Sequence, residues 1–141
     1  MGRQACRVLV FAACCALLQP VAFAQDTAKG RTLSFGYRFV QTSGEELFAN
    51  ICQGCHMPDG AGATGAGSYP PLAVNPNLES GAYPISLVLN GRRAMPPFGD
   101  RLSDEQIAAV VNYIRTHFGN DYRDQVTARE VQDARRKGDQ K

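Results

Sequence analysis

The stretch Cys52-Gln53-Gly54-Cys55-His56 decides most of what the rest of the chain can be. Its C-x-x-C-H pattern is typical of covalent haem attachment, in which each thiol forms a thioether to the porphyrin and the imidazole binds the iron. The same cysteine spacing occurs in redox dithiols and in half of a zinc site. After residue 24 the sequence contains no other cysteine and one other histidine, His117, which makes four zinc ligands hard to supply. The pattern therefore favours one covalently bound haem c.

The first 24 residues have the features of a secretory signal peptide. Arg3 and Arg7 form a basic start, an apolar run covers residues 8–18, and small residues precede a cleavage point after Ala24. Eleven apolar residues are too few to span a bilayer. We therefore expect a cleaved signal, a mature chain that begins at Gln25 and a periplasmic location, with an uncleaved anchor as the alternative. Export also suits covalent haem attachment, which needs free thiols outside the cytoplasm.

The mature chain has the size of one domain and no dominant charge. It would contain 117 residues, and without Arg3 and Arg7 its 13 basic side chains face 13 acidic ones. This balance does not favour nucleic acid or an acidic membrane surface as a partner, so we expect membrane contact only through other proteins.

A helix should lead directly into the C-x-x-C-H motif. Ser43 and Glu46 have the spacing of a capping box, which predicts a helix from about Gly44. Leu47, Phe48 and Ile51 then form one apolar stripe. Before it, residues 25–42 include apolar side chains at alternate positions, which predicts an extended strap that packs across the domain or docks to a partner.

The chain after the motif offers one well-placed second ligand. A glycine-rich loop at 59–68 and a rigid turn at 69–72 come first, and Pro84 then opens a predicted helix that Gly91 ends. Met95 follows, 39 residues after His56 and directly before two prolines. A weak thioether ligand stays bound only if the protein holds it in place, so we predict Met95 as the axial ligand opposite His56, with an ordinary core methionine as the alternative.

Together these features resemble the class I cytochromes c of the small periplasmic bacterial kind. The resemblance rests on Gly44 and Phe48 before the motif, the motif itself, a Pro-x-Leu at 70–72, the Met-Pro at 95–96 and an aromatic at Tyr113 in a later helix. It implies an all-α, cytochrome c-like fold around one haem, in which the N-terminal and C-terminal helices cross. It also implies that the backbone carbonyl of Pro70, or of Pro71 as the one-residue alternative, accepts a hydrogen bond from the His56 imidazole.

The resemblance covers about residues 43–119, which we take as the cytochrome domain. Arg92 and Arg93 either bind haem propionates or are simply solvated. Ser103 and Gln106 form a second capping box, which opens a helix with an apolar face that Gly119 should end, and His117 in the last turn should be exposed. Residues 120–141 form a charged extension in which a third capping box predicts a short helix at about 128–136, either solvated or in contact with a dehydrogenase.

Iron bound by histidine and methionine has no open position for a substrate. We therefore expect an electron-transfer protein rather than an enzyme, either free or as a subunit of a dehydrogenase complex. The resemblance implies that a periplasmic dehydrogenase donates electrons and that an oxidase or another cytochrome accepts them. The alternative is a five-coordinate haem sensor or small catalytic haem protein in which Met95 does not bind.

Overall fold

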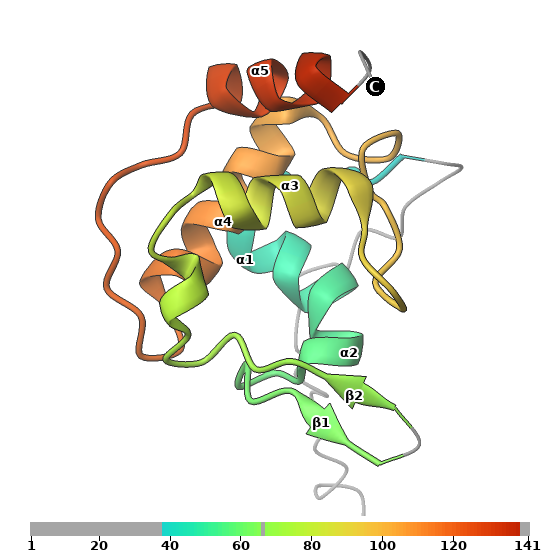
Figure 1. Cartoon of the computed structure of the whole chain (residues 1–141), viewed down its shortest axis with the longest axis vertical. Coiled ribbons are helices and arrows are strands. Elements are labelled where there is room, and N and C mark those ends of the chain that lie inside the picture. Colours follow the sequence, from blue (N-terminus) through green and yellow to red (C-terminus); the bar gives the residue numbers. More distant parts are fainter. Residues whose placement is uncertain (1–37, 66, 139–141) are drawn as a thin grey trace, which may run out of the picture. The chain divides into compact units, whose positions relative to one another are not determined.

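A computed structural model describes residues 38–65 and 67–138, which are predominantly helical (Figure 1). The first helix has three parts, α1 (Gly44–Leu47), a π-helical turn η1 (Phe48–Cys52) and α2 (Gln53–His56). The later helices are a 3₁₀ turn η2 (Pro76–Leu78), α3 (Ala82–Asn90), α4 (Asp104–Thr116) and α5 (Ala128–Gly138). The predictions for the signal peptide at 1–24, and for residues 25–37 of the strap, lie outside the described residues.

Side-chain caps begin the helices at the places that the sequence indicates. At α4 the Ser103 hydroxyl accepts the Gln106 N–H, and the Gln106 side chain accepts the Ser103 N–H at 2.8 Å, so the capping box is complete. Ser43 caps α1 by accepting the N–H of Glu46, but the return bond runs from the Ser43 hydroxyl to the Glu46 carboxylate. The first of these boxes is therefore only half formed.

The crossing of α1 and α4 forms the centre of the fold. A Cβ on Gly44 would lie 2.2 Å from the Ala109 carbonyl oxygen and 2.6 Å from the Tyr113 Cβ, so only glycine allows this approach. The Phe48 ring lies 5.7 Å from the Tyr113 ring and 4.7 Å from the Phe118 ring. The predicted all-α fold with crossing helices is therefore confirmed.

One hydrophobic core joins all the longer helices. Its fully buried members are Leu47, Ile107, Val111 and Val131, from α1, α4 and α5. Burial of each such side chain stabilises the fold by about 1.5–3 kcal/mol. No helix within the described residues has the length and apolar character needed to cross a membrane.

Three local predictions need correction. The glycine-rich loop contains a two-residue antiparallel hairpin, β1 (Ala63–Thr64) and β2 (Ser68–Tyr69), too short to show strand periodicity. Helix α3 begins at Ala82, two residues before Pro84, because proline is tolerated throughout a first turn. Helix α4 ends at Thr116, before His117 and Gly119, because the backbone of His117 is already extended, with a φ of −120° and a ψ of 176°.

The charged extension contains a helix that packs on the domain. Thr127 and Glu130 form the third capping box, with backbone N–H bonds in both directions at 2.8 and 3.3 Å. The resulting α5 contacts α3 and α4, and Val131 is completely buried between them. It therefore belongs to the core and is not a solvated helix. The proposed limits of the domain, 43–119, and of the extension, 120–141, stay predictions.

Candidate haem-binding site

The C-x-x-C-H motif lies across a change of helix type. The π turn ends at Cys52, and the N–H of Gln53 reaches back to the Phe48 carbonyl, five residues earlier. A π turn adds a residue to the helix and so changes the face that the following residues present. Cys52 consequently packs against the core, while Cys55 is exposed, and both thiols are free. Residue patterns give no signal for this turn.

His56 ends α2, and among the described residues one hydrogen bond orients its side chain. Its Nδ1 lies 2.9 Å from the Pro70 carbonyl oxygen. Because a carbonyl only accepts hydrogen bonds, Nδ1 carries the hydrogen and Nε2 keeps its lone pair. This geometry agrees with Pro70, not Pro71, as the partner. It makes Nε2 the ring nitrogen that is available to a metal.

The turn that carries Pro70 is itself fixed by backbone contacts. Gly62 donates to the His56 carbonyl at 3.0 Å, and Leu72 donates to the Gly60 carbonyl at 2.7 Å. Gly62 has a φ of 68°, and a Cβ there would lie 2.3 Å from the Tyr69 carbonyl oxygen. The glycine-rich loop therefore brings backbone close to backbone beside His56.

The Cys52 thiol lies against the hydrophobic core. Desolvation by burial, together with the nearby Cys55 thiol, raises the pKa of Cys52 to about 12. Reactive cysteines of redox dithiols have a lowered pKa instead, because the thiolate is the attacking species. The direction of this shift disfavours the dithiol alternative.

Met95 lies in a tight loop that folds against the end of α3. Arg92 and Met95 exchange two backbone hydrogen bonds of 3.0 Å, with Arg93 at a positive φ of 55° between them. Gly91 has a φ of 68°, and a Cβ there would lie 2.6 Å from the Met95 carbonyl oxygen. The Met95 side chain is half-buried against the same hydrophobic core as Cys52. The loop thus holds the Met95 thioether against the same core that the C-x-x-C-H motif contacts through Cys52.

Arg92 and Arg93 both project from this loop and are exposed. Arg92 has a long hydrogen bond, 3.4 Å, to the hydroxyl of Tyr83, a residue that is 39% exposed. Neither arginine is in a salt bridge of the described residues. Both guanidinium groups therefore remain able to bind a carboxylate such as a propionate.

Asn120 joins the His56 side of the site to the end of α4. Its side-chain amide donates to the carbonyls of Leu72 at 2.8 Å and Ile114 at 2.9 Å, and its oxygen accepts the Asn75 N–H at 2.9 Å. The turn after Pro70 is thereby attached to the helix bundle. Sequence reasoning missed this residue, and its position after Gly119 is the only local signal that could have indicated it.

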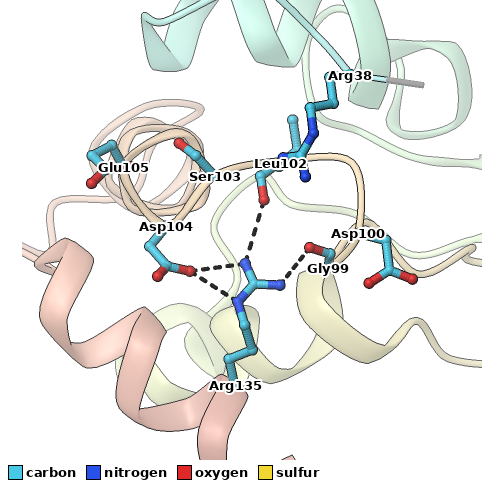
Figure 2. Close-up of a pocket in the computed structure, with 8 residues that line it drawn as sticks. All are labelled: Arg38, Gly99, Asp100, Leu102, Ser103, Asp104, Glu105 and Arg135. Atoms are coloured by element: carbon cyan, nitrogen blue, oxygen red, sulfur yellow. Dashed lines mark hydrogen bonds and ion pairs between the residues drawn. The ribbon is translucent and has the colours of Figure 1, made fainter. Parts of the chain in front are cut away.

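Two arginines, also missed, hold the remaining loops. Arg135 from α5 donates to the Gly99 carbonyl and to both the Leu102 carbonyl and the Asp104 carboxylate (Figure 2). Asp104 is the first residue of α4. Arg135 thus joins the chain that follows the Met95 loop to the extension.

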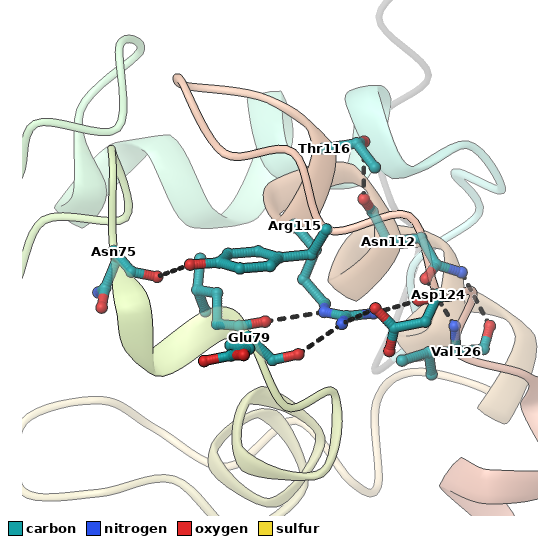
Figure 3. A network of polar contacts seen from close by, with 9 residues as sticks. Asn75, Glu79, Asn112, Arg115, Thr116, Asp124 and Val126 are labelled. Carbon is teal, nitrogen blue, oxygen red and sulfur yellow. Dashed lines mark hydrogen bonds and ion pairs between the residues drawn. The ribbon is translucent and has the colours of Figure 1, made fainter.

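The second arginine, Arg115, has a fully buried side chain (Figure 3). It donates to the carbonyls of Leu78 at 2.8 Å and Glu79 at 2.7 Å, and to both the carbonyl and the carboxylate of Asp124. The hydrogen bond from Arg115 lowers the pKa of the Asp124 carboxyl. Arg115 continues the row of Ile107 and Val111 at four-residue spacing, a signal of burial that the sequence does contain.

The residues of the site fit a covalently attached haem. Two free thiols three positions apart lie on one helix, the following imidazole has its Nδ1 hydrogen-bonded so that Nε2 is free, and a rigid loop supplies a thioether. A hydrogen bond from a metal-binding histidine to a carbonyl is the usual way in which proteins orient such a ligand. The donor set is nitrogen and sulfur, which suits haem iron.

Comparison with known proteins identifies relatives of the same kind. Residues 40–114 match the family described as "Cytochrome C oxidase, cbb3-type, subunit III". The cytochrome c subunit of the quinone alcohol dehydrogenase of Gluconobacter oxydans is 33% identical over 109 residues, which cover 68% of this chain and 22% of that protein. Cytochrome c6 of Leptolyngbya boryana is 36% identical over 73 residues, which cover 51% of this chain and 86% of that protein.

A further relative is the cytochrome c subunit of the gluconate 2-dehydrogenase of Pantoea cypripedii, 34% identical over 106 residues, which cover 67% of this chain and 24% of that protein. The chain thus spans about a quarter or less of the dehydrogenase subunits that it matches. Fold, motif and relatives together define a c-type cytochrome domain. The chain belongs to the family of the cbb3-type cytochrome c oxidase subunit III.

Proposed function

We propose that this protein is a periplasmic one-electron carrier with one covalent haem c, bound through Cys52 and Cys55 and held by His56 and Met95 as axial ligands. The observation that supports it most directly is the 2.9 Å contact between His56 Nδ1 and the Pro70 carbonyl, which leaves Nε2 free on a residue that directly follows both thiols. When bound, the haem supplies reversible one-electron exchange at its iron.

The residues of this chain have distinct tasks in that exchange. Pro70 orients His56 and increases its basicity through the shared hydrogen. The Gly91 turn holds Met95, and a methionine ligand raises the reduction potential. Arg92 and Arg93 would pair with the propionates. With His56 and Met95 both holding the iron, the site would have no room for a substrate, and the protein would transfer electrons without chemistry of its own.

The names of the relatives support a proposal about partners. Several of them are named as cytochrome subunits of dehydrogenases for alcohol, fructose and gluconate. We infer that a periplasmic dehydrogenase reduces this protein and that an oxidase or another cytochrome of the respiratory chain oxidises it. The contacts would be small and transient, as is usual for electron-transfer complexes.

Attachment of haem is tested by the pyridine haemochrome spectrum of protein exported to the periplasm. We expect the spectrum of a haem joined by two thioethers in the wild type, a one-thioether spectrum in Cys52→Ala or Cys55→Ala, and no bound haem after denaturation in the double variant. Gly54→Ala is the matched control, because a Cβ at Gly54 meets no atom within 4 Å. A colourless wild type would refute the proposal.

Carbon monoxide distinguishes the carrier from the five-coordinate alternative. A six-coordinate carrier should bind carbon monoxide slowly in the reduced state, because Met95 must leave first. Fast binding that is unchanged in Met95→Ala would favour a sensor or catalytic haem protein.

A further inference from the structure

The loop that carries Met95 has few bonds of its own after the methionine. Pro96 and Pro97 have no backbone N–H, so neither can donate to a neighbouring segment. The next residues are attached to the end of α3, by hydrogen bonds from Phe98 to the Val88 carbonyl at 2.9 Å and from Gly99 to the Leu89 carbonyl at 3.2 Å. Beyond the two backbone bonds between Arg92 and Met95, the position of Met95 therefore depends on what holds the chain that follows the two prolines.

Arg135 binds the chain at the end of the loop that follows Met95. It lies in α5, beyond residues 40–114 that match the family. Its Nη1 donates to the Gly99 carbonyl, its Nη2 to the Leu102 carbonyl at 3.3 Å, and its Nε and Nη2 to Asp104 Oδ1 at 3.0 and 2.8 Å (Figure 2). One guanidinium group thus contacts both ends of the segment 99–104, which connects the Met95 loop to α4. A lysine could not do this, since its ammonium is a compact point charge without a planar fork.

The contact is more protected than the other ion pairs of α5. The side chains of Arg135 and Asp104 are 30% and 21% exposed, whereas those of Arg129 and Asp133 are 75% and 42% exposed. Ion pairs of the latter kind contribute little, because water and salt screen them. The hydrogen bonds of a partly buried cation contribute more.

The packing of Gly99 and of α5 both favour this contact. A Cβ on Gly99 would lie 2.9 Å from the Leu89 carbonyl oxygen, so glycine allows the chain to approach the end of α3 at the point where its carbonyl accepts from Arg135. Complete burial of Val131, one helical turn earlier, fixes α5 against the domain. The arginine is therefore delivered by a packed helix and not by a free tail.

We propose that Arg135 is a positioning residue for Met95, through which the C-terminal extension keeps the thioether on the iron. This inference rests on the proposed function, in which Met95 is an axial ligand. A thioether is a weak, neutral ligand, so the fraction of time that the loop is open decides how often the ligand position is vacant. Without Arg135 the loop loses its tie to α5 and opens more often.

The test is displacement of Met95 by added imidazole in the oxidised holoprotein, followed through the near-infrared thioether-to-iron band. Imidazole binds only when the loop is open, so its apparent affinity is proportional to the open fraction. We expect Arg135→Gln to bind imidazole about tenfold more tightly than the wild type, since several charge-assisted hydrogen bonds are lost. Arg135→Lys should recover only part of the difference, and Asp104→Asn should show a smaller shift in the same direction.

Two control variants separate positioning from general stability. Arg129→Gln removes an exposed cation of the same helix and should match the wild type in both imidazole affinity and urea midpoint. Ser43→Ala removes the cap of α1, far along the chain from the Met95 loop, and should lower the urea midpoint without tightening imidazole binding. Hydrogen exchange at the amides of Phe98 and Gly99 should be about tenfold faster in Arg135→Gln and unchanged in Ser43→Ala.

The outcomes are distinguishable. Unchanged imidazole affinity in Arg135→Gln, or an increase in Ser43→Ala as large as that in Arg135→Gln, would overturn the positioning role while leaving the proposed function intact. A wild type without the thioether band would overturn the Met95 assignment itself, and this inference with it.

Discussion

The His56 side and the Met95 side of the proposed site are held in different ways. His56 stands at the end of a helix, its ring is fixed by one bond to the Pro70 carbonyl, and the two neighbouring cysteines would add covalent links. Met95 stands in a loop and depends on backbone contacts with α3 and on an arginine from the extension. Both sides are attached to distant parts of the chain, the Pro70 turn through Asn120 and the chain after Met95 through Arg135, but only His56 also stands on a helix beside two residues that can form covalent links.

The largest expected effect concerns a residue that belongs to neither side. Arg115→Met should lower the free energy of unfolding by about 3–5 kcal/mol, because three buried or half-buried carbonyls lose a charged donor. Urea unfolding of the holoprotein measures this change. Arg123→Met is the control, since the ion pair of Arg123 with Asp121 is 80% and 71% exposed and should contribute almost nothing. Equal effects of the two changes would refute the role assigned to Arg115.

A matched pair of glycines compares the two sides directly. Gly62 and Gly91 share a φ of 68°, and a Cβ would meet backbone at 2.3 Å in the first and 2.6 Å in the second. Each change to alanine should cost about 2–4 kcal/mol, from left-handed strain and from steric overlap. We expect Gly91→Ala to weaken the near-infrared thioether band, and Gly62→Ala to lower the unfolding midpoint while keeping that band.

Gly65→Ala is the control for this pair, because its Cβ meets no atom of the described residues within 4 Å and Gly65 is not among the glycines with a positive φ. If Gly62→Ala removed the thioether band as fully as Gly91→Ala, the two sides would not be held independently, and the comparison would fail.

A smaller effect is expected at Asn120, whose side-chain amide connects the turn beside His56 to α4. Asn120→Ala should cost about 1–3 kcal/mol, because the carbonyls of Leu72 and Ile114 lose their donor. It should also shift the hyperfine NMR resonances of the His56 ring, since the Pro70 turn becomes less fixed. Asn112→Ala breaks two comparable bonds, to the backbone of Val126, and should leave these resonances in place.

Much of the fold around the two sides could be predicted from the sequence, because many of its features depend only on residues that are adjacent in the chain. The caps at Ser43, Ser103 and Thr127 and the end of α3 at Gly91 each depend on a few adjacent residues, and their structural outcomes agree. The contact of His56 with the Pro70 carbonyl was predicted from a family resemblance and not from the physical properties of the residues alone. The haem-binding roles themselves stay predictions.

What the sequence could not show depends on contacts between distant residues. Arg135 looks like one of several charges on a polar helix until Gly99 and Asp104 are brought beside it. Arg115 is similar, because a buried arginine needs carbonyls from turns that lie 36 and 37 residues earlier. The π turn at Phe48–Cys52 depends on how the helix packs, which propensities do not encode.

The smallest expected effect is a loss of stability in acid. Hydrogen bonds from Arg115, from the Thr127 backbone and from Arg136 lower the pKa values of Asp124, Glu130 and Asp133 respectively. Because these pKa values are lower in the folded state, the contacts stabilise the extension above about pH 4 and are lost as the pH falls through the lowered values. The melting temperature should fall between pH 6 and pH 3, and less so in Asp124→Asn. A larger fall in that variant would contradict the assignment.

The most direct test of the two-sided site is the near-infrared spectrum of the oxidised protein in three forms, the wild type, Met95→Leu and Met57→Leu. Met57 supplies the only other thioether after residue 24, directly beside His56. We predict a thioether-to-iron band in the wild type and in Met57→Leu, and none in Met95→Leu. A wild type without the band, or a Met95→Leu variant that keeps it, would contradict the account.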